Sequence, residues 1–365
     1  MINTFHMKIG IVGLPNVGKS SLFTALTKKE VPRENYPFCT IEPNVGVTAV
    51  PDPRLSELAR VSHSKKIIPT VIEFVDIAGL VKGAHEGEGL GNTFLSHIKE
   101  VDAIAHVVRA FEAENVVHVS GRINPKEDSE TILLELIMSD LDVIEKRIRT
   151  LESEKRSGVK EAAALIALLQ KLDATLKQGK TASDASLTKD ERALVKQLNL
   201  FTAKPMLYVL NTDDSSKTSS AIIEKYRLPI PRESTIILNI QEEVELAGVA
   251  DKELNDYLTA LSRTETGLDT FIRASYAILG LITFFTSGEK ETRAWTIKNG
   301  ALAPESAGKI HSDIELGFIR AEVVNWRDFI SENGWNGAKE KGLVRIEGKE
   351  YAMKDGDVCY FRFSV

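Results

Sequence analysis

Hydrophobic residues in the first two thirds of the chain form short runs that are separated by stretches of helical spacing. The runs are Lys8–Val12, Val71–Val75, Ala103–Val108, Pro205–Leu210 and Thr235–Leu238. Short apolar runs without polar alternation are typical of strands that are buried on both faces of a parallel sheet. Helical spacing occurs between them, as in Ser20–Lys28 and Thr93–Glu100. The pattern predicts an α/β fold with a mostly parallel sheet and right-handed crossovers.

The connection between Ala103–Val108 and Pro205–Leu210 is far longer than the others. It contains two segments with apolar residues at helical spacing, Ile132–Glu152 and Ala162–Leu176, and Ser157 and Gly158 lie between them. Two such segments in succession predict an antiparallel pair of helices that is inserted into the α/β domain and projects from it. The charged residues near the end of the first helix are more typical of a solvated face than of a binding site.

The character of the sequence changes at about Leu281. Short β-like runs follow at Ala294–Ile297, Phe318–Val324, Leu343–Ile346 and Val358–Phe363, with frequent glycines between them. We expect a small, separate α+β domain at this end of the chain.

A phosphate-binding loop is the most specific motif in the chain. Gly13–Ser20 (GLPNVGKS) fits the pattern G-x-x-x-x-G-K-[ST], directly after a predicted strand and at the start of a predicted helix. The glycines allow backbone N–H groups to surround phosphates at the helix N-terminus. Lys19 is expected to bind the terminal phosphates and Ser20 to ligate Mg²⁺. A chance glycine turn between a strand and a helix is the alternative.

Two further segments fit the switch regions of such an enzyme. Asp76 follows a predicted strand and begins the sequence Asp-Ile-Ala-Gly, so it is expected to hold Mg²⁺, while Gly79 offers its N–H to the terminal phosphate. Thr40 lies in a predicted loop between two prolines and is expected to close over the γ-phosphate through Mg²⁺. The alternatives are an Asp that caps a turn and a simple turn hydroxyl.

The residue after Gly79 departs from the usual enzyme. Ras-type enzymes carry a Gln there that orients the attacking water, and this chain has Leu80. Hydrolysis is then slow, or another residue takes over this role.

The base-reading motif departs as well. Guanine-binding proteins carry N-K-x-D, whereas this chain has Asn211, Thr212, Asp213 and Asp214 after a predicted strand. We expect the Asn211 side chain and the Thr212 backbone to contact the base, with Asp214 at the position that decides specificity.

Composition adds limits rather than a function. The chain has 365 residues, 43% of them hydrophobic and 27% charged, and a formal net charge of -6, which is ordinary for a soluble protein of two or three domains. A globally acidic chain gives no general argument for nucleic-acid binding. The two cysteines, Cys39 and Cys359, are far apart and suggest neither a disulfide framework nor a metal site. No run is long enough for a membrane helix and no signal-peptide pattern is present, so we expect a cytoplasmic protein.

Several long segments together resemble the Obg-like ATPase family, also called YchF, of the TRAFAC class of P-loop NTPases. They are GLPNVGKSSLF, YPFCTIEPNVG, FVDIAGLVKGAHEGEGLGNTFLSHI, HVVRAFEAENVVHVSGRINP and FFTSGEKETRAWTIKNGALAPESAGKIHSDIELGFIRAEV. The resemblance covers essentially the whole chain and weakens in the helical insertion. It implies a P-loop G domain in two parts, a helical coiled-coil insertion and a C-terminal TGS domain of the β-grasp type. The implied ranges are 7–126, 127–200, 201–280 and 281–365.

The resemblance also implies a function. It is that of a slow ATP-hydrolysing switch that binds ribosomes (the large subunit or the 70S particle, including rRNA) or translation factors. We expect no membrane or DNA partner. The family has a hydrophobic residue in place of the catalytic Gln, and His118 is its proposed substitute, with His85 and His106 as weaker candidates. Nucleotide contacts are implied for the phosphate-loop residues Gly13, Asn16, Val17, Gly18, Lys19, Ser20 and Ser21. Asn16 is also the residue that would hold a stimulating K⁺.

Three alternatives stay open. The family usually has Glu where this chain has Asp214, which leaves a GTP-specific enzyme as an alternative to ATP. A nucleotide-stabilised scaffold without meaningful turnover is the second, and a metabolic kinase, disfavoured by the switch segments, is the third. The C-terminal range 281–365 has 12 Lys and Arg against 13 Asp and Glu, so ribosome binding follows from the resemblance rather than from charge. Trp326 and Trp335 are candidates for stacking on RNA or, more commonly, for core packing.

Overall fold

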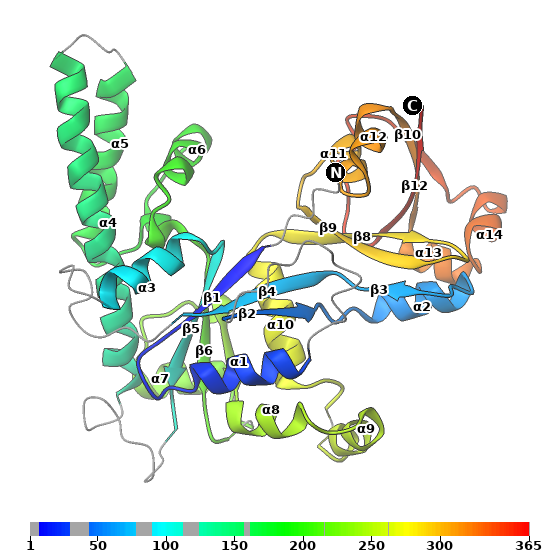
Figure 1. Ribbon diagram of the computed structural model, residues 1–365, viewed down its shortest axis with the longest axis horizontal. Coiled ribbons are helices and arrows are strands. Elements are labelled where there is room, and N and C mark those ends of the chain that lie inside the picture. Colours follow the sequence, from blue (N-terminus) through cyan, green and yellow to red (C-terminus); the bar gives the residue numbers. More distant parts are fainter. Residues whose placement is uncertain are drawn as a thin grey trace. The chain divides into compact units, whose positions relative to one another are not determined.

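The computed structural model describes residues 7–29, 44–77, 90–111, 124–156, 161–214, 216–261 and 263–364 (Figure 1). The chain divides into two compact units. One consists of Met1–Met7, Leu26–Glu73 and Leu258–Val365, and the other of Lys8–Ala25 and Phe74–Tyr257. These units cut the chain at other positions than the domain ranges expected from the sequence, which remain predictions.

The first sheet has six strands in the order β2-β4-β1-β5-β6-β7. Their bounds are β1 Lys8–Val12, β2 Val45–Ala49, β4 Val71–Asp76, β5 Ala103–Arg109, β6 Met206–Asn211 and β7 Thr235–Leu238. The pairs β1–β5, β5–β6 and β6–β7 are parallel. Every residue of β5 is buried, as its unbroken apolar run predicts for a central strand. The α/β fold with a parallel arrangement of these strands is therefore confirmed.

Helices connect these strands. Along the chain up to Ala260 they are α1 Lys19–Lys28, α2 Pro53–Val61, α3 Leu90–Lys99, α4 Pro125–Arg156, α5 Glu161–Leu176, α6 Lys189–Leu198, α7 Ser219–Tyr226, α8 Ile240–Leu246 and α9 Asp251–Ala260. Single 3₁₀ turns lie at Ala182–Asp184 (η3), Phe201–Ala203 (η4) and Arg232–Ser234 (η5). Helix α6 begins with a capping box in which Thr188 and Glu191 exchange side-chain and backbone hydrogen bonds.

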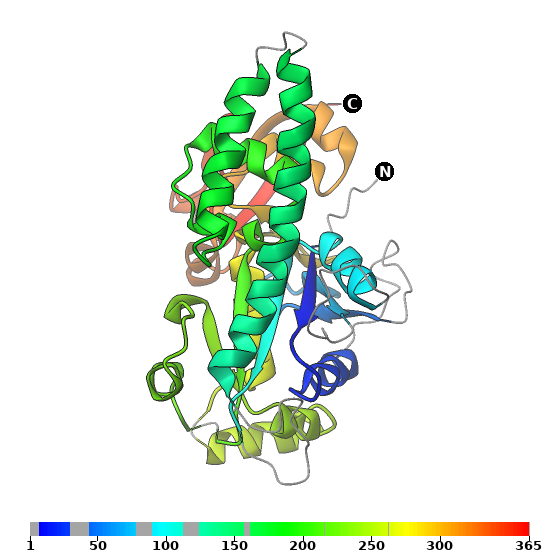
Figure 2. The ribbon, with the colours of Figure 1, turned by 90° about the vertical axis from the view of Figure 1, so that its left-hand side faces the viewer.

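The long connection contains the expected pair of helices. In both views α4 and α5 lie side by side (Figures 1 and 2). The second half of α4 buries Ile144 and Leu151 in a common core with Leu169 and Leu172 of α5. The first half of α4 instead packs against the sheet, in a cluster that includes Ile132. One helix of 32 residues thus belongs to both the sheet domain and the insertion.

A buried carboxylate fixes the return of the chain from the insertion to the sheet. Asp140 of α4 accepts hydrogen bonds from the backbone N–H groups of Phe201 and Thr202, both at 2.8 Å. Burial raises the pKa of Asp140, and these hydrogen bonds oppose the shift. Two residues later, Lys204 Nζ donates to the backbone oxygens of Ile98 and Lys99, both at 2.9 Å, and so caps the C-terminus of α3.

The second sheet also has six strands, in the order β11-β10-β12-β8-β9-β3. Their bounds are β3 Ile67–Ile68, β8 Leu281–Ser287, β9 Thr292–Lys298, β10 Phe318–Asn325, β11 Arg345–Glu347 and β12 Asp357–Phe363. It is a mixed sheet, because β10 is antiparallel to β11 and β12 whereas β12 is parallel to β8. The accompanying helices are α10 Gly267–Ile278, α11 Ala303–Gly308, α12 Ser312–Leu316, α13 Trp326–Ser331 and α14 Trp335–Glu340.

Helices cover parts of both faces of this sheet. On one face, Ala303 and Ala307 of α11 pack with Phe284 and Phe361. On the other, Leu58 of α2 packs in a cluster with strand and helix residues that include Phe285, Val324, Phe329, Ala338 and Val358. Helix α2 and strand β3 therefore complete the unit that contains residues 281–364, although they lie more than two hundred positions earlier in the chain.

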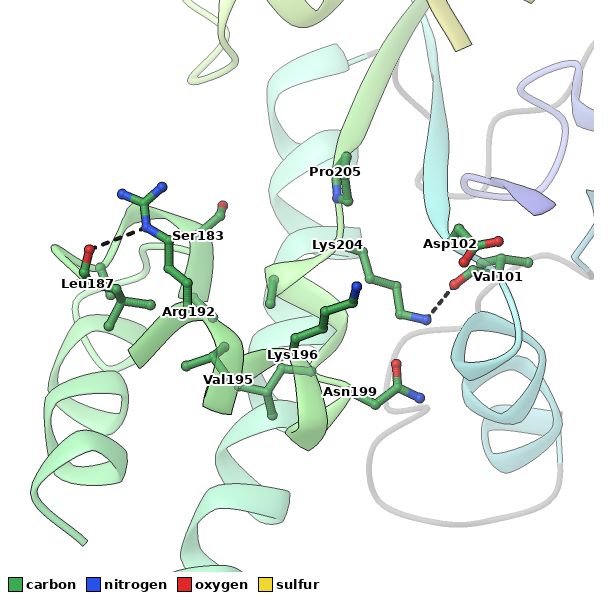
Figure 3. A pocket seen from close by; sticks show the side chains of 14 residues that line it. Val101, Asp102, Ser183, Leu187, Arg192, Val195, Lys196, Asn199, Lys204 and Pro205 are labelled. Carbon is green, nitrogen blue, oxygen red and sulfur yellow. Dashed lines mark hydrogen bonds between the residues drawn. The ribbon is translucent and has the colours of Figure 1, made fainter. Parts of the chain in front are cut away.

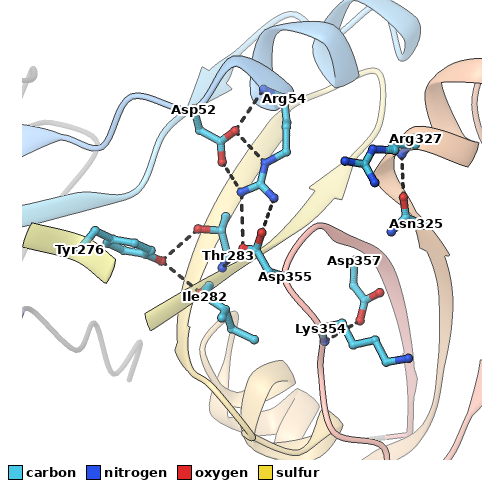
Figure 4. A network of polar contacts seen from close by, with 10 residues as sticks. All are labelled: Asp52, Arg54, Tyr276, Ile282, Thr283, Asn325, Arg327, Lys354, Asp355 and Asp357. Carbon is cyan, nitrogen blue, oxygen red and sulfur yellow. Dashed lines mark hydrogen bonds and ion pairs between the residues drawn. The ribbon is translucent and has the colours of Figure 1, made fainter. Parts of the chain in front are cut away.

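An arginine network ties α2 to the loop before β12 (Figure 4). The Arg54 guanidinium donates to Asp52 Oδ2 at 2.7 Å and to Asp355 Oδ2 at 2.6 Å. Asp355 Oδ1 in turn accepts the backbone N–H of Thr283 at 2.9 Å. Although burial opposes the charge, the hydrogen bonds to Asp52 and Asp355 raise the pKa of Arg54. The network explains why α2 is held in this unit by more than apolar contacts.

Candidate nucleotide-binding site

The phosphate loop joins β1 to α1 at the carboxyl end of the parallel strands. Gly18 has a φ of 106°, and a Cβ there would lie 2.7 Å from Asn211 Nδ2. A Cβ at Gly13 would lie 2.5 Å from the backbone oxygen of Val107. Both positions thus require glycine, for conformation or for close approach, as the motif predicts.

Lys19 points back into its own loop. Its side chain is buried, with 7% of the residue exposed, and Nζ donates to the backbone oxygen of Leu14 at 2.8 Å. Burial lowers the pKa of Lys19, and the charge of Asp76 partly offsets this shift. The ammonium group can therefore exchange its hydrogen bond to the Leu14 carbonyl for a stronger, charge-assisted one to an anionic group.

Two of the residues expected to hold Mg²⁺ lie together. Ser20 Oγ donates to Asp76 Oδ2 at 3.2 Å. The other carboxylate oxygen, Oδ1, is buried and has no hydrogen-bond partner in the described part of the chain. A hydroxyl beside a carboxylate with a buried, unpaired oxygen fits a small hard cation. No group of three or more His, Cys, Asp or Glu able to hold a metal occurs among the described residues, so the pair would need further ligands from elsewhere.

The side chain of Asn211 is occupied by protein groups. Its Nδ2 donates to the backbone oxygen of Val17 at 2.9 Å, and its Oδ1 accepts the backbone N–H of Ile240 at 3.2 Å. Only 6% of the residue is exposed. These hydrogen bonds join the phosphate loop to the start of α8, and contact of Asn211 with a base stays a prediction.

The next residues of the motif form hydrogen bonds within the protein as well. The Thr212 backbone N–H donates a hydrogen bond to the backbone oxygen of Leu238 at 3.0 Å. The Asp214 carboxylate accepts from the backbone and hydroxyl of Ser216 and forms an ion pair with Lys217 at 3.4 Å. The Ser216 hydrogen bonds, with a smaller contribution from Lys217, lower the pKa of Asp214. Its neighbour Asp213, rather than Asp214, lines the adjoining cavity.

That cavity has a volume of about 660 Å³ and begins at the phosphate loop. Its lining includes the predicted residues Asn16, Gly18, Ser21, Asn211 and Thr212, together with Phe111, Asn239, Ile240, Gln241, Glu242 and Glu245. No sequence motif marks this second group. A signal was available, because most of the group directly follows the predicted strand Thr235–Leu238, and carboxyl ends of parallel strands meet at one edge.

His106 lies beneath the loop, on β5. It is 1% exposed, and its Nδ1 has no hydrogen-bond partner in the described part of the chain. Burial, with a contribution from the Lys19 charge, lowers the pKa of His106 to about 3. The ring is therefore neutral at physiological pH, and its burial argues against direct contact with an attacking water.

Several predicted site residues lie outside the described residues. They are Thr40, Gly79, Leu80, His85 and His118, and Cys39 lies outside them too. The other cysteine, Cys359, is a free, buried thiol whose pKa is raised by burial.

A further cavity of about 460 Å³ lies at the opposite ends of β5 and β6, beside α6 (Figure 3). Its lining includes Asp102, Arg192, Lys196 and Lys204 but none of the predicted nucleotide-binding residues.

Nothing in the described part of the chain forms a helix that is both long and apolar enough to span a bilayer.

Comparisons with known proteins agree with one another. Residues 8–137 match a family model described as "50S ribosome-binding GTPase", and residues 281–364 match the model YchF-GTPase_C, described as a protein of unknown function. The chain is 50% identical to "Ribosome-binding ATPase YchF" of Bacillus subtilis, over 98% of this chain and 99% of that protein. Identity to the protein of the same name from Escherichia coli O157:H7 is 47%, with the same shares covered. The solved structure of the Schizosaccharomyces pombe YchF GTPase superposes with a TM-score of 0.87 at 34% identity and covers 98% of both chains. The chain therefore belongs to the YchF family.

Proposed function

We propose that this protein is a slow ATP-hydrolysing switch that binds ribosomes and couples its nucleotide state to that partner. The observation that carries the proposal is the pairing of Ser20 with Asp76, whose second oxygen is buried and unpaired, at the end of a complete phosphate loop. The bacterial relatives are named ribosome-binding ATPases, which supports both the reaction and the partner. Such a partner implies a cytoplasmic protein.

The triphosphate would occupy the loop from Gly13 to Ser21, where backbone N–H groups and the N-terminus of α1 favour negative charge. Lys19 would transfer its hydrogen bond from the Leu14 carbonyl to the terminal phosphates. Ser20 and Asp76, with Thr40, would hold Mg²⁺, which neutralises charge on the β- and γ-phosphate oxygens when bound. Asn16, whose left-handed φ of 62° places it at the turn of the loop, is the residue that would hold a K⁺ ion.

The base would enter the cavity beside Phe111 and α8. Guanine reading depends on a carboxylate at the Asp214 position, and here that carboxylate is engaged by Ser216 and Lys217 outside the cavity lining. The lining presents amide and carboxylate acceptors, including Gln241 and Glu242, which can accept from the exocyclic amine of a base. We favour ATP because the carboxylate that reads guanine lies outside this lining and the bacterial relatives are named ATPases. GTP remains the alternative, and the similar protein from Schizosaccharomyces pombe is named a GTPase.

Hydrolysis requires that a residue other than Leu80 orient the water. We assign that role to His118, since an imidazole can position or deprotonate water near neutral pH. The helices α4 and α5 would form a coiled-coil arm, and residues 281–365 a TGS domain of the β-grasp type. These two parts would carry the nucleotide state from the switch segments to the ribosome.

Two assays test this proposal. Phosphate release from ATP should be slow in the wild type and at least about tenfold slower in His118→Ala. This is a conservative minimum, because loss of a general base typically lowers the rate by more. Co-sedimentation with purified ribosomes should differ between an ATP analogue and ADP. Turnover that is absent in the wild type, with sedimentation unaffected by nucleotide, would instead support a nucleotide-stabilised scaffold.

A further inference from the structure

The cavity beside α6 lies where the insertion rejoins the parallel sheet (Figure 3). Its walls come from the residues that lead into β5 and β6, from η3 and the segment after it, and from α6. All of these elements belong to one compact unit. The proposed nucleotide reaction makes no use of this cavity, because the phosphate loop lies at the carboxyl ends of the parallel strands and the cavity lies at their amino ends.

The apolar floor of the cavity is fixed by buried contacts. Its residues Ala182, Val195 and Leu200 all belong to the core that α4 and α5 share. Thr202 Oγ1 accepts the backbone N–H of Ala182 at 2.9 Å and donates to Asp140 Oδ2 at 2.7 Å, so η3 and η4 are both tied to α4. A mostly apolar cavity with a fixed floor and a volume of about 460 Å³ is typical of a small-molecule site.

Two of the charged side chains that line the cavity are satisfied by the protein. Lys204 Nζ donates to three backbone oxygens, at 2.9, 2.9 and 2.5 Å, which uses all three of its N–H donors. Asp102 Oδ2 accepts the backbone N–H of Lys8 at 2.9 Å. Burial lowers the pKa of Lys204, and the charge of Asp102 partly offsets this shift. This pair of opposite charges therefore leaves no donor for a ligand.

Two further cations keep free donors. Arg192 and Lys196 lie one turn apart on α6, and both are exposed. Arg192 Nε donates to the backbone oxygen of Leu187 at 3.3 Å, and its terminal nitrogens have no partner among the described residues. The Lys196 ammonium has neither a hydrogen bond nor an ion pair within the described ranges, and Figure 3 shows this side chain extending toward Lys204. The apolar floor thus lies beside two cations that can bind an anion.

The direction of α6 limits the charge of that anion. Lys196 lies in the last turn of the helix and Asn199 is its C-cap, and both residues line the cavity. The partial negative charge at a helix C-terminus disfavours a polyphosphate. A single carboxylate matches the planar guanidinium and the ammonium, and the apolar floor requires an apolar body on the same molecule.

We propose that this cavity binds a small organic acid, whose apolar body packs on Val195 and Leu200 and whose carboxylate accepts from Arg192 and Lys196. The ligand would touch α6 and η3 as well as the residues that lead into β5 and β6, so it would stabilise the junction between the insertion and the sheet. This site is independent of the proposed nucleotide reaction, and its test requires no turnover.

The test is a titration of the full-length protein with naphthoate and with octanoate, followed by saturation-transfer NMR of the ligand. Naphthamide is the uncharged match of naphthoate and should bind about threefold to fivefold more weakly, which is the size of an exposed ion pair. Naphthoate binding should weaken as the salt concentration is raised. A non-hydrolysable ATP analogue should leave naphthoate bound, because the phosphate loop lies at the other end of the strands.

Lys196→Gln should weaken naphthoate binding by about threefold to fivefold and leave naphthamide binding unchanged. Lys189→Gln is the matched control, since it removes a cation at the start of the same helix that does not line the cavity. A cation in the last turn also stabilises a helix, so thermal unfolding of both variants without ligand separates a loss of stability from a loss of binding.

Three results would overturn the site. They are failure of both acids to bind saturably below about 1 mM, equal binding of naphthoate by Lys196→Gln and Lys189→Gln, and displacement of naphthoate by the ATP analogue. A loss that is confined to the acid and to Lys196→Gln, at unchanged unfolding temperature and in the presence of the ATP analogue, would support it.

Discussion

The phosphate end and the base end of the candidate site differ in how directly their motifs determine geometry. At the phosphate end, Gly13, Gly18, Lys19 and Ser20 occupy the positions that the motif requires. At the base end, Asn211 bonds to protein groups and Asp214 lies outside the cavity lining. A phosphate loop binds its ligand through backbone geometry, which glycine spacing fixes, whereas base recognition depends on side chains whose hydrogen bonds can be satisfied within the protein.

The largest effect is expected at the phosphate end. Lys19→Met removes the charge aimed at the terminal phosphates and should lower turnover by at least about 100-fold, the size seen when one preorganised electrostatic donor is lost. Affinity for the diphosphate should fall much less than affinity for the triphosphate analogue. Lys28→Met, at the other end of α1, is the control, and equal losses in both variants would contradict the role of Lys19.

Asn211→Ala distinguishes a structural residue from a base contact. It leaves the Val17 carbonyl and the Ile240 N–H without partners in a buried position, so the free energy of unfolding should fall by about 2–3 kcal/mol. Chemical denaturation measures this change. Affinities for ATP and GTP analogues should fall by the same factor, and a loss confined to one nucleotide would show that Asn211 reads the base.

The buried imidazole beneath the loop predicts acid sensitivity. The folded-state pKa of His106 is about 3 and the ordinary value is 6.5, so below pH 6.5 the unfolded chain binds a proton that the folded chain does not. Stability should fall by about 1.4 kcal/mol per pH unit from this group as pH drops from 6.5 toward 3. Denaturation of the wild type and His106→Leu at pH 7 and pH 5 tests this. Parallel losses in the two proteins would exclude His106 as the cause.

The smallest effect is expected for Asp214→Asn. The carboxylate is solvated and its partners Ser216 and Lys217 are local, so ATP-analogue affinity should change less than about threefold. Isothermal titration measures the change. A large loss of GTP-analogue affinity alone would indicate that Asp214 turns into the cavity when a base is bound.

The structural features that the sequence predicted are those that neighbouring residues determine, and the features that it missed depend on partners far away in the chain. The apolar runs located β1 and β7 at their observed bounds, and β4, β5 and β6 within one residue at either end, because buried strands carry their own pattern. Helix α2 and the two-residue strand β3 were not expected to join residues 281–364, because their apolar contacts and the Arg54–Asp355 pair are set by distant partners. The further cavity residues were missed because no motif marks them, although most of them directly follow the predicted strand Thr235–Leu238. They are Phe111, Asn239, Ile240, Gln241, Glu242 and Glu245.

The ATP-dependent switch is tested most directly by a paired titration of the purified protein with non-hydrolysable ATP and GTP analogues in the presence of Mg²⁺ and K⁺. We expect a clear preference for the ATP analogue that requires Mg²⁺ and is lost in Asp76→Ala. A clear preference for the GTP analogue would contradict it and would mean that Asp214 reads guanine in the bound state.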